Sequence, residues 1–137
     1  MTTDLWQQAN EQFQAKQFQV AKSSCEQLLA EQPEHAMAYC LLSSCFLNLN
    51  RPRLATFNAF QACKHDSGAL AARDILAISG ACLSVGETFL AHSVLGYIDI
   101  NDKNSRAALL DIGRQYSALE DQPTALRFIQ RAHAEGF

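Results

Sequence analysis

Four alanines recur along this chain at an almost constant interval, and that interval limits the folds open to it. They are Ala21, Ala55, Ala91 and Ala125, which lie 34, 36 and 34 residues apart. Four units of about this length account for all 137 residues. A fixed period of this size is typical of repeat proteins, in which each unit is one motif that stacks on the next. We therefore expect one domain, 1–137, with repeats at about 2–35, 36–68, 69–103 and 104–137.

The last unit shows the pattern inside one repeat. From Arg106 to Phe137 it contains two helical patterns around a break at Glu120-Asp121-Gln122. One stripe of the first helix holds Leu109, Ile112, Gly113 and Tyr116, and one stripe of the second holds Ala125, Ile129 and Ala132. Pro123 falls in the first turn of the second helix, where its missing N–H costs little. The small residues on both stripes predict two antiparallel helices in close approach.

The first two units repeat this plan with other turn residues. In the first unit Gln17-Phe18 should begin the second helix, and in the second unit the turn is predicted at Asn50-Arg51-Pro52. Pro33 should end the second helix of the first unit, and Gly68 should cap the second helix of the second unit. The two extra residues before Ala91 should lengthen the connection around Asp66-Ser67-Gly68.

The third unit is the least regular of the four. Its turn is predicted at Gly86-Glu87, and its second helix should carry Ala91, Leu95 and Ile98. Gly80 and Gly96 are predicted to lie inside helices, where each costs about 1 kcal/mol relative to alanine. The turn residues that follow, Asn101-Asp102-Lys103-Asn104-Ser105, should end this unit, and Asn104 or Ser105 can cap the fourth.

Period, stripes and turns together resemble the tetratricopeptide repeat (TPR) family over essentially the whole chain. The large-large-small-large set of the TPR pattern is filled by Tyr39, Leu42, Ser43 and Phe46 in the second repeat. The consensus tryptophan position departs from the pattern, because it holds Leu5, Tyr39, Ile75 and Leu109. The resemblance implies an all-α fold, a right-handed superhelix of four TPR-like helix-turn-helix repeats with eight antiparallel helices. A bundle of four helix pairs without superhelical stacking is the alternative.

Composition argues against nucleic-acid and membrane ligands. The net charge is −3 and shows no basic stripe, so nucleic-acid binding is not expected. The longest uncharged stretch, His35 to Asn50, includes polar residues and is shorter than the roughly 20 apolar residues of a membrane span. Residues 1–15 show no basic and apolar pattern of a signal peptide. Five cysteines without framework spacing fit reduced thiols, so we predict a cytoplasmic protein.

No arrangement of residues in the sequence indicates catalysis. There is no glycine-rich phosphate loop, HExxH, G-x-S-x-G or CxxC motif, so we expect no enzymatic activity, cofactor or metal. Cys40 and Cys45 are five residues apart and point to different faces of one helix, and Cys63 and His65 also diverge. No two cysteines are placed to converge, so no disulfide is expected. The cysteines are predicted to be small apolar core residues, and the histidines to be solvated or to cap helices.

The TPR resemblance implies a binding groove lined by the first helix of each repeat. Matched to this register, it would contain Trp6, Asn10, Phe13 and Gln14; Met37, Cys40, Ser44, Leu47 and Asn48; Arg73, Leu76, Gly80 and Leu83; Ala107, Leu110, Arg114 and Ser117. Some TPR cochaperones bind a C-terminal carboxylate there. Only Asn10 and Arg73 match that clamp, and Trp6, Leu41 and Ala77 replace its other members, so we reject that ligand class.

A mostly apolar groove suits a different ligand, an amphipathic helix or a hydrophobic peptide. We therefore predict a protein-protein interaction scaffold with a protein or peptide partner. Trp6 is expected to be exposed, whereas Leu76, Leu83 and Leu110 could instead pack against neighbouring helices. Two other functions stay open. The chain could be the N-terminal arm of a larger enzyme, since RFIQRAHAEGF weakly resembles the TPR arm before bacterial sulfotransferase domains, or it could be a small chaperone for secretion substrates.

The last helical pattern also predicts self-association. Ala125, Phe128 and Ala132 form one flank that can pack inside the fourth repeat. Leu126, Ile129 and His133 form an adjoining flank that nothing in the sequence would cover. We expect Leu126 and Ile129 to pair with a second copy of the chain, as a symmetric homodimer, or with a following domain.

Overall fold

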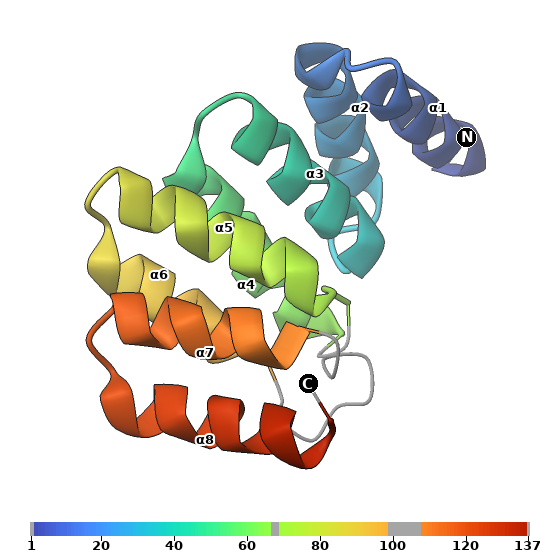
Figure 1. Cartoon of the computed structure of the whole chain (residues 1–137). Helices are drawn as coiled ribbons and strands as arrows, with labels where there is room; N and C mark the ends of the chain where they lie inside the picture. Colours follow the sequence, from blue (N-terminus) through green and yellow to red (C-terminus); the bar gives the residue numbers. More distant parts are fainter. Residues whose placement is uncertain (1, 67–68, 99–107, 137) are drawn as a thin grey trace. The chain divides into compact units, whose positions relative to one another are not determined.

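The computed structural model describes residues 2–66, 69–98 and 108–136 of the chain. These residues form eight helices and no strand (Figure 1), which confirms the predicted all-α class and helix number. In chain order the helices are α1 (Thr2–Gln14), α2 (Phe18–Glu31), α3 (Ala36–Asn48), α4 (Pro52–His65), α5 (Ala72–Ser84), α6 (Thr88–Leu95), α7 (Leu109–Ala118) and α8 (Gln122–Ala134).

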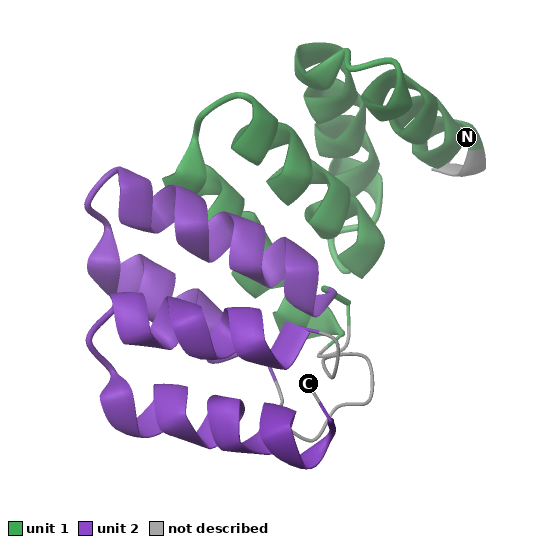
Figure 2. Cartoon of the chain, in the orientation of Figure 1, with its two compact units in different colours: residues 1–70 green, residues 71–137 purple. Residues whose placement is uncertain are grey.

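The helices belong to two compact units, Met1–Leu70 and Ala71–Phe137 (Figure 2). Unit 1 contains the helix pairs α1–α2 and α3–α4, and unit 2 contains α5–α6 and α7–α8. The division falls within two residues of the predicted boundary between the second and third repeats. The organisation of 1–137 as a single domain stays a prediction.

The turn inside each pair is built around one residue with a left-handed backbone. These residues are Lys16, Asn50, Gly86 and Glu120, with φ of 62°, 60°, 82° and 63°. They recur at 34, 36 and 34 residues, the interval of the alanines. The N–H of the next residue closes the turn onto the preceding helix, as in Gln17 N to Gln12 O and Asp121 N to Tyr116 O, both 2.9 Å. This is the hydrogen bond of a Schellman helix end, and it places all four turns in one register.

A second repeated position lies twelve residues before each alanine, on the first helix of the pair. It holds a small residue every time: Ala9, Ser43, Ser79 and Gly113. Ser43 Oγ donates to Ala55 O at 2.7 Å, and Ser79 Oγ donates to Ala91 O at 2.9 Å. A Cβ atom on Gly113 would lie 3.2 Å from Ala125 O. The four alanines are buried, so the predicted close approach of paired helices is present in each repeat.

Helix starts and ends follow the proline and cap signals. Pro33 lies two residues after α2 ends at Glu31, as predicted, and Pro52 and Pro123 lie in the first turns of α4 and α8. His35 Nδ1 accepts from Ala38 N to cap α3, and Asp121 Oδ1 accepts from Thr124 N to cap α8. The connection between α4 and α5 spans 66–71, two residues more than the connection 32–35 between α2 and α3. The predicted lengthening is confirmed.

The third repeat departs from its predicted helix length. We expected α6 to include Gly96 and Ile98, but the helix ends at Leu95, with Gly96 as its C-terminal cap residue. Glycine is a poor helix former, which disfavours a further turn of α6 through Gly96. Ile98 is still buried, from a position outside the helix. The predicted turn Asn101–Ser105, the caps Gly68, Asn104 and Ser105, and the groove residue Ala107 all lie outside the described residues.

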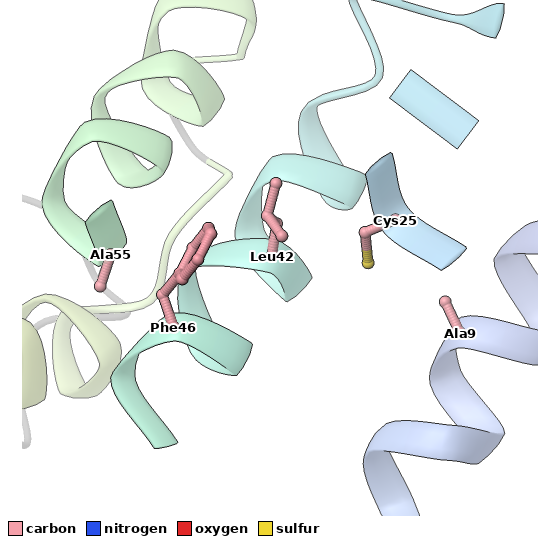
Figure 3. Packing of buried hydrophobic residues seen from close by; sticks show 5 residues of the cluster. All are labelled: Ala9, Cys25, Leu42, Phe46 and Ala55. Atoms are coloured by element: carbon pink, nitrogen blue, oxygen red, sulfur yellow. The ribbon is translucent and has the colours of Figure 1, made fainter. Parts of the chain in front are cut away.

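Each unit has its own buried side chains. In unit 1 the cluster of Ala9, Cys25, Leu42, Phe46 and Ala55 joins the four helices (Figure 3). In unit 2 the Tyr116 and Phe128 rings stack at 5.4 Å between α7 and α8. Within the described part of the chain, no helix is long and apolar enough to cross a membrane.

Candidate interaction surfaces

In unit 1 the predicted groove residues come from α1 and α3. Trp6 and Phe13 on α1 are half-buried, and Met37 at the start of α3 is 48% exposed. The Trp6 ring lies 5.2 Å from the His35 ring, and the Phe13 ring contacts Phe18 edge-on at 5.3 Å. Trp6 was expected to be exposed, and the structure has it half-buried. The indole has one covered side because the loop before α3 brings His35 against it.

The polar residues of this surface are already engaged within their own helices. Asn10 Nδ2 donates to Trp6 O at 2.9 Å, and Asn48 Nδ2 donates to Ser44 O at 2.8 Å. Each amide still has its carbonyl oxygen available as an acceptor. These side chains fit a role in orienting a ligand better than a role as its main contact.

Two residues assigned to the groove are parts of the packing of unit 1. Cys40 is buried, with Sγ 3.4 Å from Ala69 O, so it is not on an open surface and we remove it from the groove. Leu47 is partly buried against the core cluster. The sequence register alone cannot distinguish a packed residue from an exposed groove residue, since both Cys40 and Leu47 occupy positions that line the groove in the TPR pattern.

In unit 2 the corresponding residues come from α5 and α7. Arg73 is exposed at the start of α5, and three apolar residues, Leu76, Leu83 and Leu110, are half-buried. Arg114 is exposed and pairs with Asp111 at 3.3 Å on its own helix. Gly80 lies in the middle of α5 with open space where a Cβ would be. Two roles were considered for the leucines, lining the groove and packing against neighbouring helices. Half-burial agrees with both, because each leucine has one packed and one open side.

Some large exposed apolar residues lie outside the predicted groove. Phe89 at the start of α6 is 80% exposed and Phe57 on α4 is 57% exposed, and Leu54 and Val85 are also exposed. Phe57 and Phe89 belong to the second helices of their repeats and lie off the alanine stripe. Their position off the alanine stripe is the feature of the sequence that could have predicted their exposure. These residues provide a second surface against which the groove assignment can be tested.

All five cysteines are buried, as expected of core residues. Interaction with Cys45, together with burial, raises the pKa of the Cys25 thiol, and the absence of a disulfide stays a prediction. The two residues lie on different helices, α2 and α3, and sequence spacing compares only residues on the same helix. In the described residues, no three histidines, cysteines or carboxylates gather in a way that could hold a metal ion.

One charged contact joins the two helix pairs of unit 2. His92 Nε2 on α6 lies 2.7 Å from Asp121 Oδ2, and the His92 ring meets Tyr116 edge-on at 5.5 Å. The hydrogen bond with His92, together with the cap bond to Thr124, lowers the pKa of Asp121 below its ordinary 3.8. Burial raises the pKa of Tyr116. The contact links α6 to the N-terminal cap of α8.

The last helix confirms one of its two predicted flanks. Ala125, Phe128 and Ala132 are buried, as expected for the inner flank. Leu126 is 54% exposed on the outer flank. Ile129 does not belong there in full: it is half-buried, and its Cγ1 would be 2.8 Å from a Cβ on Gly113. Because Gly113 has no side chain, Ile129 fills the space against α7.

Two solved structures, both of MamA, are similar to this chain. One matches with a TM-score of 0.70 at 13% identity, over 92% of this chain and 72% of its own. The other matches with a TM-score of 0.74 at 14% identity, over 97% of this chain and 72% of its own. No family model matches the sequence, and no curated protein matches it. At this identity the likeness shows the fold alone: the chain has a TPR-like, all-α helical-repeat fold.

Proposed function

We propose that this chain is a non-enzymatic protein-interaction module that binds an amphipathic helix or a hydrophobic peptide on the first helices of its repeats. One observation carries the proposal. The first helices present half-buried apolar side chains at repeat-equivalent positions: Trp6, Phe13 and Leu47 in unit 1 and Leu76, Leu83 and Leu110 in unit 2.

Half-burial of such side chains is what a binding surface requires. The packed side fixes the position of the residue before a ligand arrives, which reduces the entropy lost on binding. The open side offers apolar area, and covering it contributes about 25 cal/mol for each Å² removed from water. An amphipathic helix supplies a stripe of apolar side chains along one face, which suits an apolar binding surface.

Charge at this surface favours a ligand with an acidic flank. Arg73 is exposed near Leu76, one helical turn away on α5, and Arg114 is exposed near Leu110 on α7. An acidic residue beside the apolar stripe of the ligand could form an ion pair with Arg73. The net charge of −3 gives no support to a nucleic-acid ligand. We propose a cytoplasmic location because the five cysteines lack the spacing of a disulfide framework and fit reduced thiols.

The test uses helical peptides selected from a display library against the full chain, with affinities measured by calorimetry. We expect Met37→Glu and Arg73→Glu each to weaken binding about tenfold, a loss of about 1.4 kcal/mol. Both residues are exposed, so circular dichroism should be unchanged. Leu47→Asp is a poor variant because Leu47 packs against the core.

Matched controls come from the second helices. Phe57→Glu and Phe89→Glu introduce the same charge at exposed apolar sites. We expect them to change affinity less than twofold. If these variants abolish binding and Met37→Glu and Arg73→Glu do not, the ligand binds the second helices and the groove proposal is wrong.

We also propose that the outer flank of α8 mediates homodimer formation, which the exposure of Leu126 supports. Ile129 contributes less than predicted because part of its side chain packs on α7. Light scattering at high micromolar concentration should give a dimer mass for the wild type and a monomer mass for Leu126→Glu. Gln130→Glu, an exposed change on the same helix, is the control. A monomer mass for the wild type would contradict this proposal without affecting the groove.

A further inference from the structure

His35 lies in the loop between α2 and α3 and makes two contacts at once. Its Nδ1 atom accepts a hydrogen bond from Ala38 N at 3.0 Å, which caps the start of α3. Its ring also lies 5.2 Å from the Trp6 ring of α1. The side chain is half-buried. One imidazole therefore joins α1 to the first turn of α3.

This cap differs from those of the other first helices. The helices α5 and α7 begin after Ala71 and Ala108, which have no side-chain acceptor. The usual cap residues are Ser, Thr, Asp and Asn, whose oxygens accept without any change near neutral pH. Histidine is the side chain that gains a charge between about pH 5 and 8. Among α3, α5 and α7, only α3 therefore has a side-chain cap, and it is one that a proton can remove.

We propose that His35 is a proton-dependent cap, which holds the start of α3 in its neutral form and releases it on protonation while staying beside Trp6. The neutral ring has its proton on Nε2, because Nδ1 is the acceptor. A protonated imidazole has an N–H donor at both nitrogens. The Nδ1–H and the Ala38 N–H would then point at each other, so the ring has to turn away from α3.

The helix end adds to this effect, and the main chain limits it. The N-terminal end of a helix carries a partial positive charge, so a cation at the cap position is disfavoured. Ala38 N also donates to His35 O at 3.1 Å, and Tyr39 N donates to the same oxygen at 3.3 Å. These two bonds do not involve the ring. Protonation should therefore open the cap and leave the first turn of α3 in place.

The contact with Trp6 responds in the opposite direction. A cation within about 6 Å of the centre of an indole ring is attracted to the face of that ring. The His35 and Trp6 ring centres are 5.2 Å apart. Protonation therefore weakens the link of His35 to α3 and strengthens its link to α1.

No charged side chain pairs with the His35 ring in the part of the chain that the structure describes. The charged and titratable groups on the elements packed against it are Asp4 and Glu11 of α1; Lys22, Cys25, Glu26 and Glu31 of α2; Glu34 of the loop; and Tyr39, Cys40 and Cys45 of α3. Lys22 pairs with Glu26, and the Tyr39 ring stacks on His65. No carboxylate therefore holds the protonated ring at the cap position.

The released end of α3 includes part of the proposed binding surface. Met37 is the second residue of α3, and Trp6 is the other residue that His35 contacts. We expect protonation to leave Met37 less fixed and to place a charged ring beside Trp6, so an apolar ligand should bind more weakly. This consequence rests on the proposed function, whereas the cap is a property of the free chain.

Nuclear magnetic resonance of the free chain at about pH 8 and about pH 5 tests the cap. The nitrogen shifts of the His35 ring report its tautomer and its charge. At the higher pH we expect an unprotonated Nδ1 and an Overhauser contact from the ring to the Ala38 amide. At the lower pH this contact should be lost, the contact with the Trp6 ring kept, and exchange of the Ala38 amide, corrected for its intrinsic pH dependence, about fivefold faster. A protonated ring that still contacts the Ala38 amide, or that leaves Trp6, would overturn the proposal.

His35→Asn is the matched variant, because asparagine caps a helix with an oxygen that does not titrate. Its Ala38 amide should exchange at the same corrected rate at both pH values, whereas His35→Ala should show the faster rate at both. An equal pH dependence in the wild type and His35→Asn would also overturn the proposal.

The selected peptides test the consequence for binding. The wild type should lose more affinity than His35→Asn when the pH falls, and equal losses would refute the link between the cap and the binding surface. If no peptide binds the first helices, the proposed function fails, and the exchange data on the free chain still decide the cap.

Discussion

The helix pairs α5–α6 and α7–α8 achieve the same close approach by opposite means. In α5–α6, Ser79 fills the contact position and donates its hydroxyl to Ala91 O, while also accepting from Gln115 Nε2 at 3.2 Å. In α7–α8 the position is Gly113, and Ile129 from the opposite helix fills the space. A small residue at this register therefore specifies that two helices approach. The residue on the facing helix decides whether a hydrogen bond or an aliphatic side chain completes the contact.

The strongest test of this comparison is a methyl group added at Gly113. In Gly113→Ala, the new Cβ would lie 2.8 Å from Ile129 Cγ1 and 3.2 Å from Ala125 O. Overpacking of this kind typically costs about 1–3 kcal/mol. Denaturant unfolding should show this loss, and the loss should be smaller when it is measured in an Ile129→Ala background, which lacks the Cγ1 atom.

Gly80 is the matched control, because it is also a glycine inside a first helix. A Cβ there meets nothing within 4 Å. Gly80→Ala should therefore stabilise the protein by about 0.5–1 kcal/mol, the difference in helix propensity. Equal effects of the two substitutions would mean that α7 and α8 are farther apart than the structure shows.

A smaller loss is expected when the hydroxyl of the α5–α6 pair is removed. Ser79→Ala removes the bond to Ala91 O and leaves Gln115 without its acceptor, at a cost of about 1–1.5 kcal/mol. Ser43→Ala removes the equivalent 2.7 Å bond to Ala55 O and should cost less, because no glutamine donates to Ser43 in the bonds described. Chemical unfolding of both variants gives the difference, and a larger loss for Ser43→Ala would refute the role given to Gln115.

The turns of the same two pairs differ in a way that predicts effects of opposite sign. Gly86 and Glu120 both have a left-handed backbone, which only glycine adopts without steric cost. Gly86→Ala should destabilise the protein, and Glu120→Gly should stabilise it, each by about 0.5–1 kcal/mol. Thermal unfolding of the two variants is the measurement. A loss of stability in Glu120→Gly would show that the Glu120 side chain has a compensating role.

The smallest effect concerns the contact between the pairs, His92 with Asp121. The folded pKa of Asp121 is lowered below 3.8, so the folded state favours the ionised carboxylate. Its contribution to stability is present above the unfolded pKa and is lost as the pH falls through the folded pKa. The thermal midpoint of the wild type should therefore fall more steeply below pH 4 than that of Asp121→Asn. Identical acid profiles would mean that the contact adds nothing to stability.

Much of the fold could be predicted because several features of the sequence recur in each repeat and define the same register. The alanine interval, the small residues twelve positions earlier and the prolines each locate the same helix pairs, so an irregular unit is corrected by its neighbours. The end of α6 at Leu95 escaped this check. The period gives the position of a helix in the repeat but not how far its last turn continues, and Gly96 ended it early.

The candidate surface was less predictable, and the reason is physical. A groove register assigns residues by their position on one helix, whereas exposure depends on what the next helix and loop place against them. Cys40 and Ile129 were assigned to open surfaces and are packed, and Trp6 is partly covered by His35.

The position of Trp6 has a practical consequence for measurement. It is the single tryptophan of the chain, and it lies in unit 1 with its ring beside His35. Its emission is therefore an optical label for the first unit, whereas the far-ultraviolet signal of the backbone sums over both. Unfolding followed by the two signals together distinguishes one cooperative domain from two independent ones. Coincident curves mean that both units unfold as one, and separated curves give the stability of unit 1 directly.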